Sequence, residues 1–112
     1  MPLYMSSFGY RPEVWAGLIR NPENREEVVG RIFEEAGCTL RGLWYAFGEG
    51  DGFALFEAPD TRAAAGIAIA IAASGAFRSF ETTPVMTQAE ALEALEFAAG
   101  VHYAPPAEAV HA

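Results

Sequence analysis

The chain has 112 residues, a length typical of a single domain. It contains 15 acidic and seven basic side chains, which give a formal net charge of −8, and 52% of its residues are apolar. All seven basic residues are arginines and they form no continuous run, which argues against binding to nucleic acid or to an anionic membrane surface. The apolar content suggests self-association, because one chain of this size buries only part of its own surface.

The first third of the chain predicts one strand followed by two helices. Residues 3–10 are β-prone and lead into a proline, so we expect a strand there. Residues 13–20 place their apolar side chains on one helical face. Asn21 is a good N-cap for a second helix that would begin at Pro22, and Gly37 is expected to end that helix.

A hairpin is predicted next. Residues 39–47 and 53–58 are rich in β-branched and aromatic side chains, and we expect each to form a strand. The five residues between them, Gly48-Glu49-Gly50-Asp51-Gly52, have the length and the glycine content of a hairpin loop. The two strands are therefore expected to be antiparallel neighbours.

The segment 61–74 predicts a helix that is apolar on every side. Its isoleucines alternate as they would in a strand, but its length, its alanine content and the following Gly75 favour a helix capped by Asp60. A helix of this kind has to be covered on every side. Its outer side could be covered only by the C-terminal segment or by another subunit.

The last part of the chain predicts an edge strand and a final helix. Pro84 lies within the predicted strand 77–86, and proline removes a hydrogen-bond donor, so this strand should lie at a sheet edge. Thr87 and Glu90 have the spacing of a capping box for a helix that reaches Ala99. Residues 101–112 contain two prolines and are expected to form a surface or disordered tail.

This order of elements predicts an α+β fold. A β-α-β-β-α-β order with right-handed crossovers gives the ferredoxin-like split plait, with a four-stranded antiparallel sheet. Strands one and three would be central and strands two and four would form the edges. The domain is expected to span residues 1–100, with an additional C-terminal helix, and the tail to span residues 101–112.

Several segments of the chain resemble the GYD-domain family of small bacterial proteins over roughly residues 2–97. They are Tyr4, Ala36-Gly37, Leu40-Arg41-Gly42, Trp44-Tyr45, Phe47 to Asp51, and Glu57 to Asp60. The resemblance implies a ferredoxin-like fold related to the dimeric α/β barrels, and it implies no defined biochemical role. The family tends to have a tyrosine where this chain has Gly50, and often a second glycine where it has Cys38.

Five residues are candidates for a ligand site. Trp15, Trp44 and Tyr45 combine a large apolar area with a polar tip, which suits a pocket lining, although such aromatic residues are more often part of a core or a subunit contact. Strand alternation puts Trp44 and Tyr45 on opposite faces of the sheet. Glu49 and Asp51 are two carboxylates in one loop that could exchange protons or hold a cation, although a hairpin loop needs polar residues in any case.

The remaining reactive side chains give weaker signals. Cys38 follows a helix C-terminus, where the helix dipole disfavours a thiolate, so we expect a buried structural thiol. His102 and His111 lack carboxylate or cysteine neighbours at ligand spacing, so no metal and no cofactor are expected. His102 and Tyr103 could still fold back over the mouth of a pocket.

The compartment can also be predicted. Residues 1–10 have neither a basic nor an apolar signal region, and the longest uncharged stretch, residues 63–77, is shorter than the roughly 18 residues that a membrane span needs. A single cysteine fits a reducing cytoplasm. We therefore expect a cytoplasmic protein that binds neither membrane nor nucleic acid.

Three functional hypotheses follow. The first is a homo-oligomer, paired through its open sheet faces as a dimeric α/β barrel, that binds a small, partly apolar molecule without a cofactor. The second is a cofactor-independent enzyme, an isomerase, cyclase or monooxygenase, that moves protons with Tyr45, Glu49, Asp51 or His102. The third is a structural or regulatory oligomer whose interface contains no ligand site.

Overall fold

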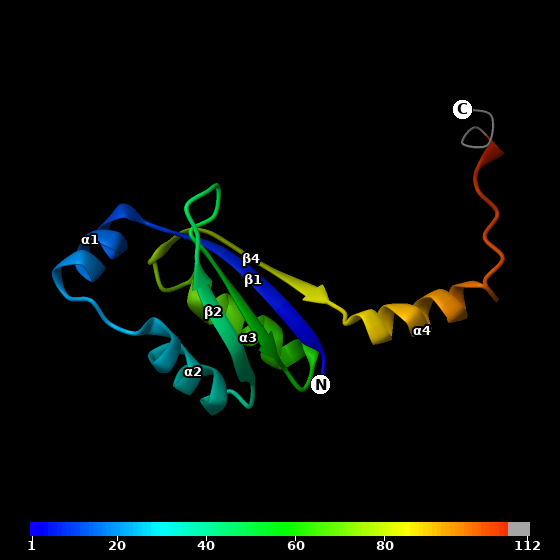
Figure 1. The fold of residues 1–112 in the computed structure, drawn as a ribbon, viewed down its shortest axis with the longest axis horizontal. Helices are drawn as coiled ribbons and strands as arrows, with labels where there is room; N and C mark the ends of the chain where they lie inside the picture. The colour runs from blue at the N-terminus through cyan, green and yellow to red at the C-terminus, as the bar shows by residue number, and fades with distance from the viewer. Residues whose placement is uncertain (108–112) are drawn as a thin grey trace.

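The computed structural model describes residues 1–107 and confirms the ferredoxin-like plait (Figure 1). The four strands form one antiparallel sheet in the order β2-β3-β1-β4, so the first and third strands are central, as predicted. The elements are β1 (Leu3–Tyr10), α1 (Pro12–Arg20), α2 (Arg25–Glu35), β2 (Thr39–Tyr45), β3 (Gly52–Glu57), α3 (Thr61–Ala72), β4 (Phe77–Val85) and α4 (Gln88–Ala98).

Strand alternation gives the sheet one face covered by helices and one open face. Along β1, Tyr4, Ser6 and Phe8 are buried, while the residues between them are partly exposed. Pro84 lies on the edge strand β4, where it pairs with Tyr4 of β1. An edge strand has a neighbour on one side only, so it tolerates a proline, which lacks a backbone N–H. The helix-covered face is therefore the one that contains the core and any cavity beneath the helices.

The core lies where α2 and α3 meet the middle of the sheet. Phe56 on β3 and Phe33 on α2 are almost completely buried, and their rings meet edge to face with centroids 4.9 Å apart. Tyr4 stacks on Phe56 from the neighbouring strand. The other buried members of the core cluster are Cys38, Ala58, Ala64 and Ile67.

The start of α2 differs from the sequence prediction. Asn24, not Asn21, is the N-cap, and its side chain accepts hydrogen bonds from the backbone N–H groups of Glu26 and Glu27. Asn21 instead follows the end of α1, donating its N–H to the carbonyl of Gly17, and Pro22 prevents that helix from continuing. Both asparagines are suitable caps, and the helix begins after the second of them.

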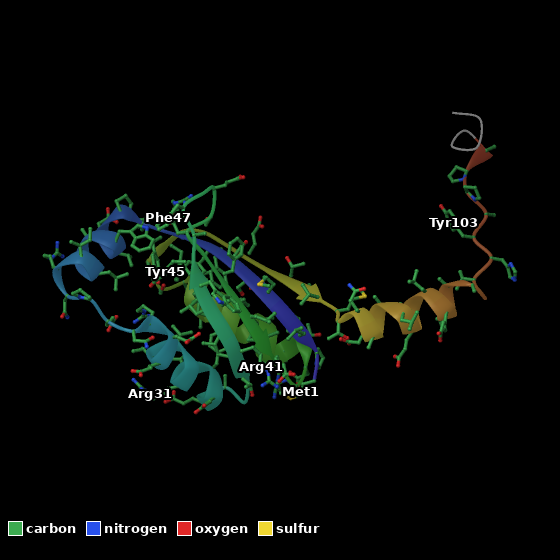
Figure 2. The ribbon with its side chains drawn as sticks, in the orientation of Figure 1. Met1, Arg31, Arg41, Tyr45, Phe47 and Tyr103 are labelled. Carbon is green, nitrogen blue, oxygen red and sulfur yellow. The ribbon has the colours of Figure 1, made fainter. Side chains whose placement is uncertain are left out.

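Strand β2 also ends earlier than predicted. The predicted strand reached Phe47, but the pairing with β3 stops at Tyr45 and Gly52. The Ala46 N–H then donates to the Asp51 carbonyl and closes the hairpin. Phe47 is fully exposed in the hairpin loop (Figure 2).

Helix α3 forms as predicted, with the Asp60 side chain accepting from the Ala63 N–H at 2.8 Å. Its inner side buries Ala64 and Ile67, whereas its outer side leaves Ile69 68% exposed. Within the described part of the chain, no helix is both long and apolar enough to cross a bilayer.

Helix α4 does not cover α3. It begins with the predicted capping box between Thr87 and Glu90, and then leads away from the sheet (Figure 1). None of its residues is buried, and its apolar side chains Leu92, Leu95 and Phe97 are exposed. Tyr103 lies further along the same arm, far from the sheet (Figure 2).

Candidate functional site

A cavity of about 600 Å³ lies between the helix-covered face of the sheet and the three helices α1, α2 and α3. Cavities of this size suit small molecules. Its floor includes Phe8 and Ala54, and its walls include Phe33 on α2 and Ile71 on α3. The rings of Phe77 and Phe80 on β4 complete an apolar interior.

The polar groups inside the cavity are few and have hydrogen-bond partners. Ser6 is buried on the floor, and its hydroxyl lies 2.8 Å from the hydroxyl of Thr82 on the neighbouring strand. Tyr10, at the end of β1, places its hydroxyl 3.3 Å from that of Tyr45. The interior is therefore mostly apolar, and the hydroxyls of Ser6 and Tyr10 are among its few polar groups.

Aromatic rings surround Tyr10. The ring of Trp15 on α1 packs edge-on against both Tyr10 and Tyr45, with centroid separations of 5.1 Å to each. Burial raises the pKa of Tyr10 well above its ordinary value, and the hydrogen bond with Tyr45 raises it further. Tyr10 is consequently a protonated hydroxyl that can donate a hydrogen bond.

Asp51 fixes the position of this aromatic cluster. Its Oδ2 atom accepts hydrogen bonds from the Tyr10 backbone N–H at 2.8 Å and from the Trp15 indole N–H at 3.3 Å. The Arg78 guanidinium lies 3.3 Å from the same oxygen. The Tyr10 N–H contributes most to lowering the pKa of Asp51, and Trp15 and Arg78 act in the same direction against partial burial. Asp51 is thus an ionised structural anchor that joins the hairpin loop, β1, α1 and β4.

A charged pair is among the residues that line the cavity. Arg25, the first residue of α2, forms an ion pair with Glu23 at 2.9 Å, and both residues line the cavity. Arg25 lies close enough to Tyr10 to oppose the rise in the pKa of that tyrosine. Asn21 lines the cavity beside this pair.

The structure brings together three of the five residues predicted for a ligand site. Trp15, Tyr45 and Asp51 surround Tyr10 at one end of the cavity, so they support its wall from behind. Trp44 lies on the open face of the sheet, where its ring packs over Gly42. Glu49 contributes only its backbone carbonyl, which accepts a hydrogen bond from Arg78. Ligand binding by any of the five stays a prediction.

Sequence reasoning missed the residues that line the cavity itself. Tyr10 and Phe8 belong to the alternating set along β1, and this period-two pattern was the available signal. The position of Arg25 at the start of α2 was not predicted, because the helix was expected to begin at Pro22. Phe77 and Phe80 could be assigned to the helix-covered face only after the register with β1 was known.

The other reactive side chains do not join this site. Cys38 is buried in the core, and burial raises the pKa of its thiol, in agreement with a structural role. His102 lies beyond α4 on the exposed arm, and His111 falls outside the described residues. Within residues 1–107, no three His, Cys, Asp or Glu side chains group in a way that could hold a metal ion.

Comparison with known proteins supports both the family and the fold. The family model described as GYD domain matches residues 4–95. The crystal structure of FFRP-DM1 is similar in fold, with a TM-score of 0.50 and 13% sequence identity over 77% of this chain and 100% of that chain. No protein with a curated description matches this chain. Because the family match covers most of the plait, this chain belongs to the GYD-domain family.

Proposed function

We propose that this protein is a homo-oligomeric module that binds a small, partly apolar molecule without a cofactor. The observation that carries the proposal is the cavity of about 600 Å³, which combines aromatic walls with a few polar side chains, Tyr10 and Arg25 close together among them. This combination of an apolar lining and convergent polar groups is typical of ligand sites. Proton transfer by Asp51 and Tyr10 is less favoured than binding, because the pKa of Asp51 is lowered and that of Tyr10 is raised, so both lie away from the neutral range in which a general acid or base works best.

The cavity can be tested with an uncharged apolar dye. Nile red, whose emission increases in apolar surroundings, is expected to bind the purified protein. Replacing Ala70, which lines the cavity from α3, by Phe should fill part of the space and weaken binding about tenfold. The matched control is Ala94→Phe on α4, which does not line the cavity. Equal binding by the two variants, or no binding by the native protein, would contradict the proposal.

Self-association is proposed from a second surface, the open face of the sheet. Trp44 is 53% exposed and Phe53 is 40% exposed on paired positions of β2 and β3. A sheet face that exposes such aromatic residues is typical of a surface that a partner covers. The exposed apolar residues of α4 are a further surface that a partner could cover.

The oligomeric state can be measured by native mass spectrometry at micromolar concentration. A multiple of the chain mass is expected, and Trp44→Glu should dissociate it because a carboxylate would then be buried between the sheets. Phe47→Glu, in the exposed hairpin loop, is the control that should leave the assembly intact. A monomeric native protein would exclude the oligomer, and an intact Trp44→Glu oligomer would exclude this interface.

A further inference from the structure

We propose that the cavity selects a small organic monocarboxylate, whose carboxylate binds Arg25 and the Tyr10 hydroxyl while its apolar body occupies the aromatic interior. This inference rests on the proposed function, because it names the ligand class of the same cavity. Three features carry it: the Arg25 guanidinium in the lining, the Tyr10 hydroxyl close to it, and the apolar side chains that form most of the remaining walls.

Arg25 is the group in the lining that can pair with an anion. It is partly buried, and it is the one positively charged residue among those that line the cavity within residues 1–107. Its guanidinium donates a hydrogen bond from Nη1 to Glu23 and also lies close to the Tyr10 hydroxyl. A guanidinium has five N–H donors in a planar fork, which leaves capacity for a second carboxylate.

Tyr10 supplies a second donor near the same place. Its side chain is buried and lines the cavity, and its hydroxyl shares one hydrogen bond with Tyr45. Either hydroxyl can donate in this bond, and a ligand carboxylate beside Tyr10 would favour the arrangement in which Tyr45 donates to Tyr10 and the Tyr10 hydrogen points to the carboxylate. A guanidinium and a neutral hydroxyl together match a carboxylate, which accepts hydrogen bonds at both oxygens.

The remaining walls set the character of the rest of the ligand. Phe8, Phe77 and Phe80 present rings to the interior, and Ile71 closes it from α3. These side chains offer no partner for additional polar groups. A second charge on the ligand would therefore lie mainly against apolar walls and neutral hydroxyls such as that of Ser6, which already bonds to Thr82, at a high desolvation cost that favours a monocarboxylate over a dicarboxylate.

The ion pair between Glu23 and Arg25 allows a second test of the carboxylate site. In the structure its carboxylate occupies Arg25, so a ligand carboxylate has to compete with it or share the guanidinium. Replacing Glu23 by Gln removes the competing charge and should strengthen binding of an acid. Replacing Arg25 by Gln should weaken it. The two neighbouring substitutions are thus expected to act in opposite directions.

The experiment compares 4-phenylbutyrate with its uncharged amide, 4-phenylbutanamide, by isothermal titration calorimetry. The acid is expected to bind at least about tenfold more tightly than the amide, as a charge-assisted hydrogen bond allows. Arg25→Gln should abolish this preference and Glu23→Gln should increase it. Arg31→Gln, an exposed arginine on the same helix, should change neither affinity.

Each negative result has a distinct meaning. Equal affinity for acid and amide, or a preference that survives Arg25→Gln, would overturn the carboxylate inference while the binding function stands. Nile red binding without binding of 4-phenylbutyrate would do the same. Failure of the dye and of both ligands would instead overturn the proposed function together with this inference.

Discussion

The carboxylate of Asp51 accepts the backbone N–H of Tyr10 at 2.8 Å, and this bond ties the hairpin loop to the end of β1. A second bond between the same segments runs from the Asp51 N–H to the carbonyl of Phe8 at 2.8 Å. The loop therefore positions Tyr10, whose side chain lines the cavity and bonds to Tyr45.

Replacing Asp51 by Asn should destabilise the protein, because the charged acceptor of Tyr10, Trp15 and Arg78 is lost. The pKa of Asp51 is lowered in the folded state, so its contribution is complete above the ordinary carboxyl pKa of about 3.9 and disappears as the pH falls through the folded value. Urea unfolding between pH 2 and 7 should show the difference between native and variant proteins shrinking at the acid end. Glu49→Gln is the control, and a difference that does not depend on pH would contradict the assignment.

Gly52 and Gly50 should respond differently to the same substitution. A methyl group at Gly52 would lie 2.4 Å from the Phe8 ring and 2.7 Å from the Trp44 carbonyl, so Gly52→Ala forces the backbone to shift. We expect a loss of about 1–3 kcal/mol in the free energy of unfolding. At Gly50 the nearest atom would be 3.6 Å away, an ordinary contact, so Gly50→Ala should be tolerated. Denaturant unfolding measures both, and equal effects would disprove the close packing at Gly52.

Phe33 should be the most costly side chain to truncate on α2. It is 2% exposed and packs on Phe56, so Phe33→Ala should lower the free energy of unfolding by about 3–5 kcal/mol. The neighbouring Ile32 is 47% exposed, and Ile32→Ala should cost about 1 kcal/mol or less. Thermal and urea unfolding of the two variants would show a reversed order if α2 packed through its other face.

Removing the N-cap of α4 should affect only that helix, whereas removing the N-cap of α2 should lower the stability of the whole domain. Thr87→Ala removes the capping box of α4, which has no buried residue to hold it, and an isolated helix of 11 residues is marginal in water. We expect increased hydrogen exchange in residues 88–98 with an unchanged unfolding midpoint of the sheet domain. Asn24→Ala should instead lower the global stability by about 1 kcal/mol, because α2 packs on the core. A global loss from Thr87→Ala would show that α4 is docked in solution.

The plait could be predicted from the sequence because local residues mark where its helices and strands begin and end. Gly37 and Gly75 have positive φ values after α2 and α3, a conformation that glycine adopts without steric cost. Asp60 and Thr87 cap the helices that they were predicted to cap. Pro84 restricts its strand to an edge. Each of these signals acts within a few residues, so it can be read without knowledge of the rest of the fold.

The residues of the cavity depend on contacts between distant segments. Tyr10, Arg25 and Phe77 come together only through the pairing of β1 with β4 and the placement of α2 over the sheet. Trp15 and Asp51 meet because the hairpin loop bonds to the end of β1. The sequence by itself determined the elements, their order and the acidic, apolar character of the chain. The tertiary structure decided which aromatic residues enclose a space and which lie on an open face, because strand register and helix placement arise from the packing of the whole core.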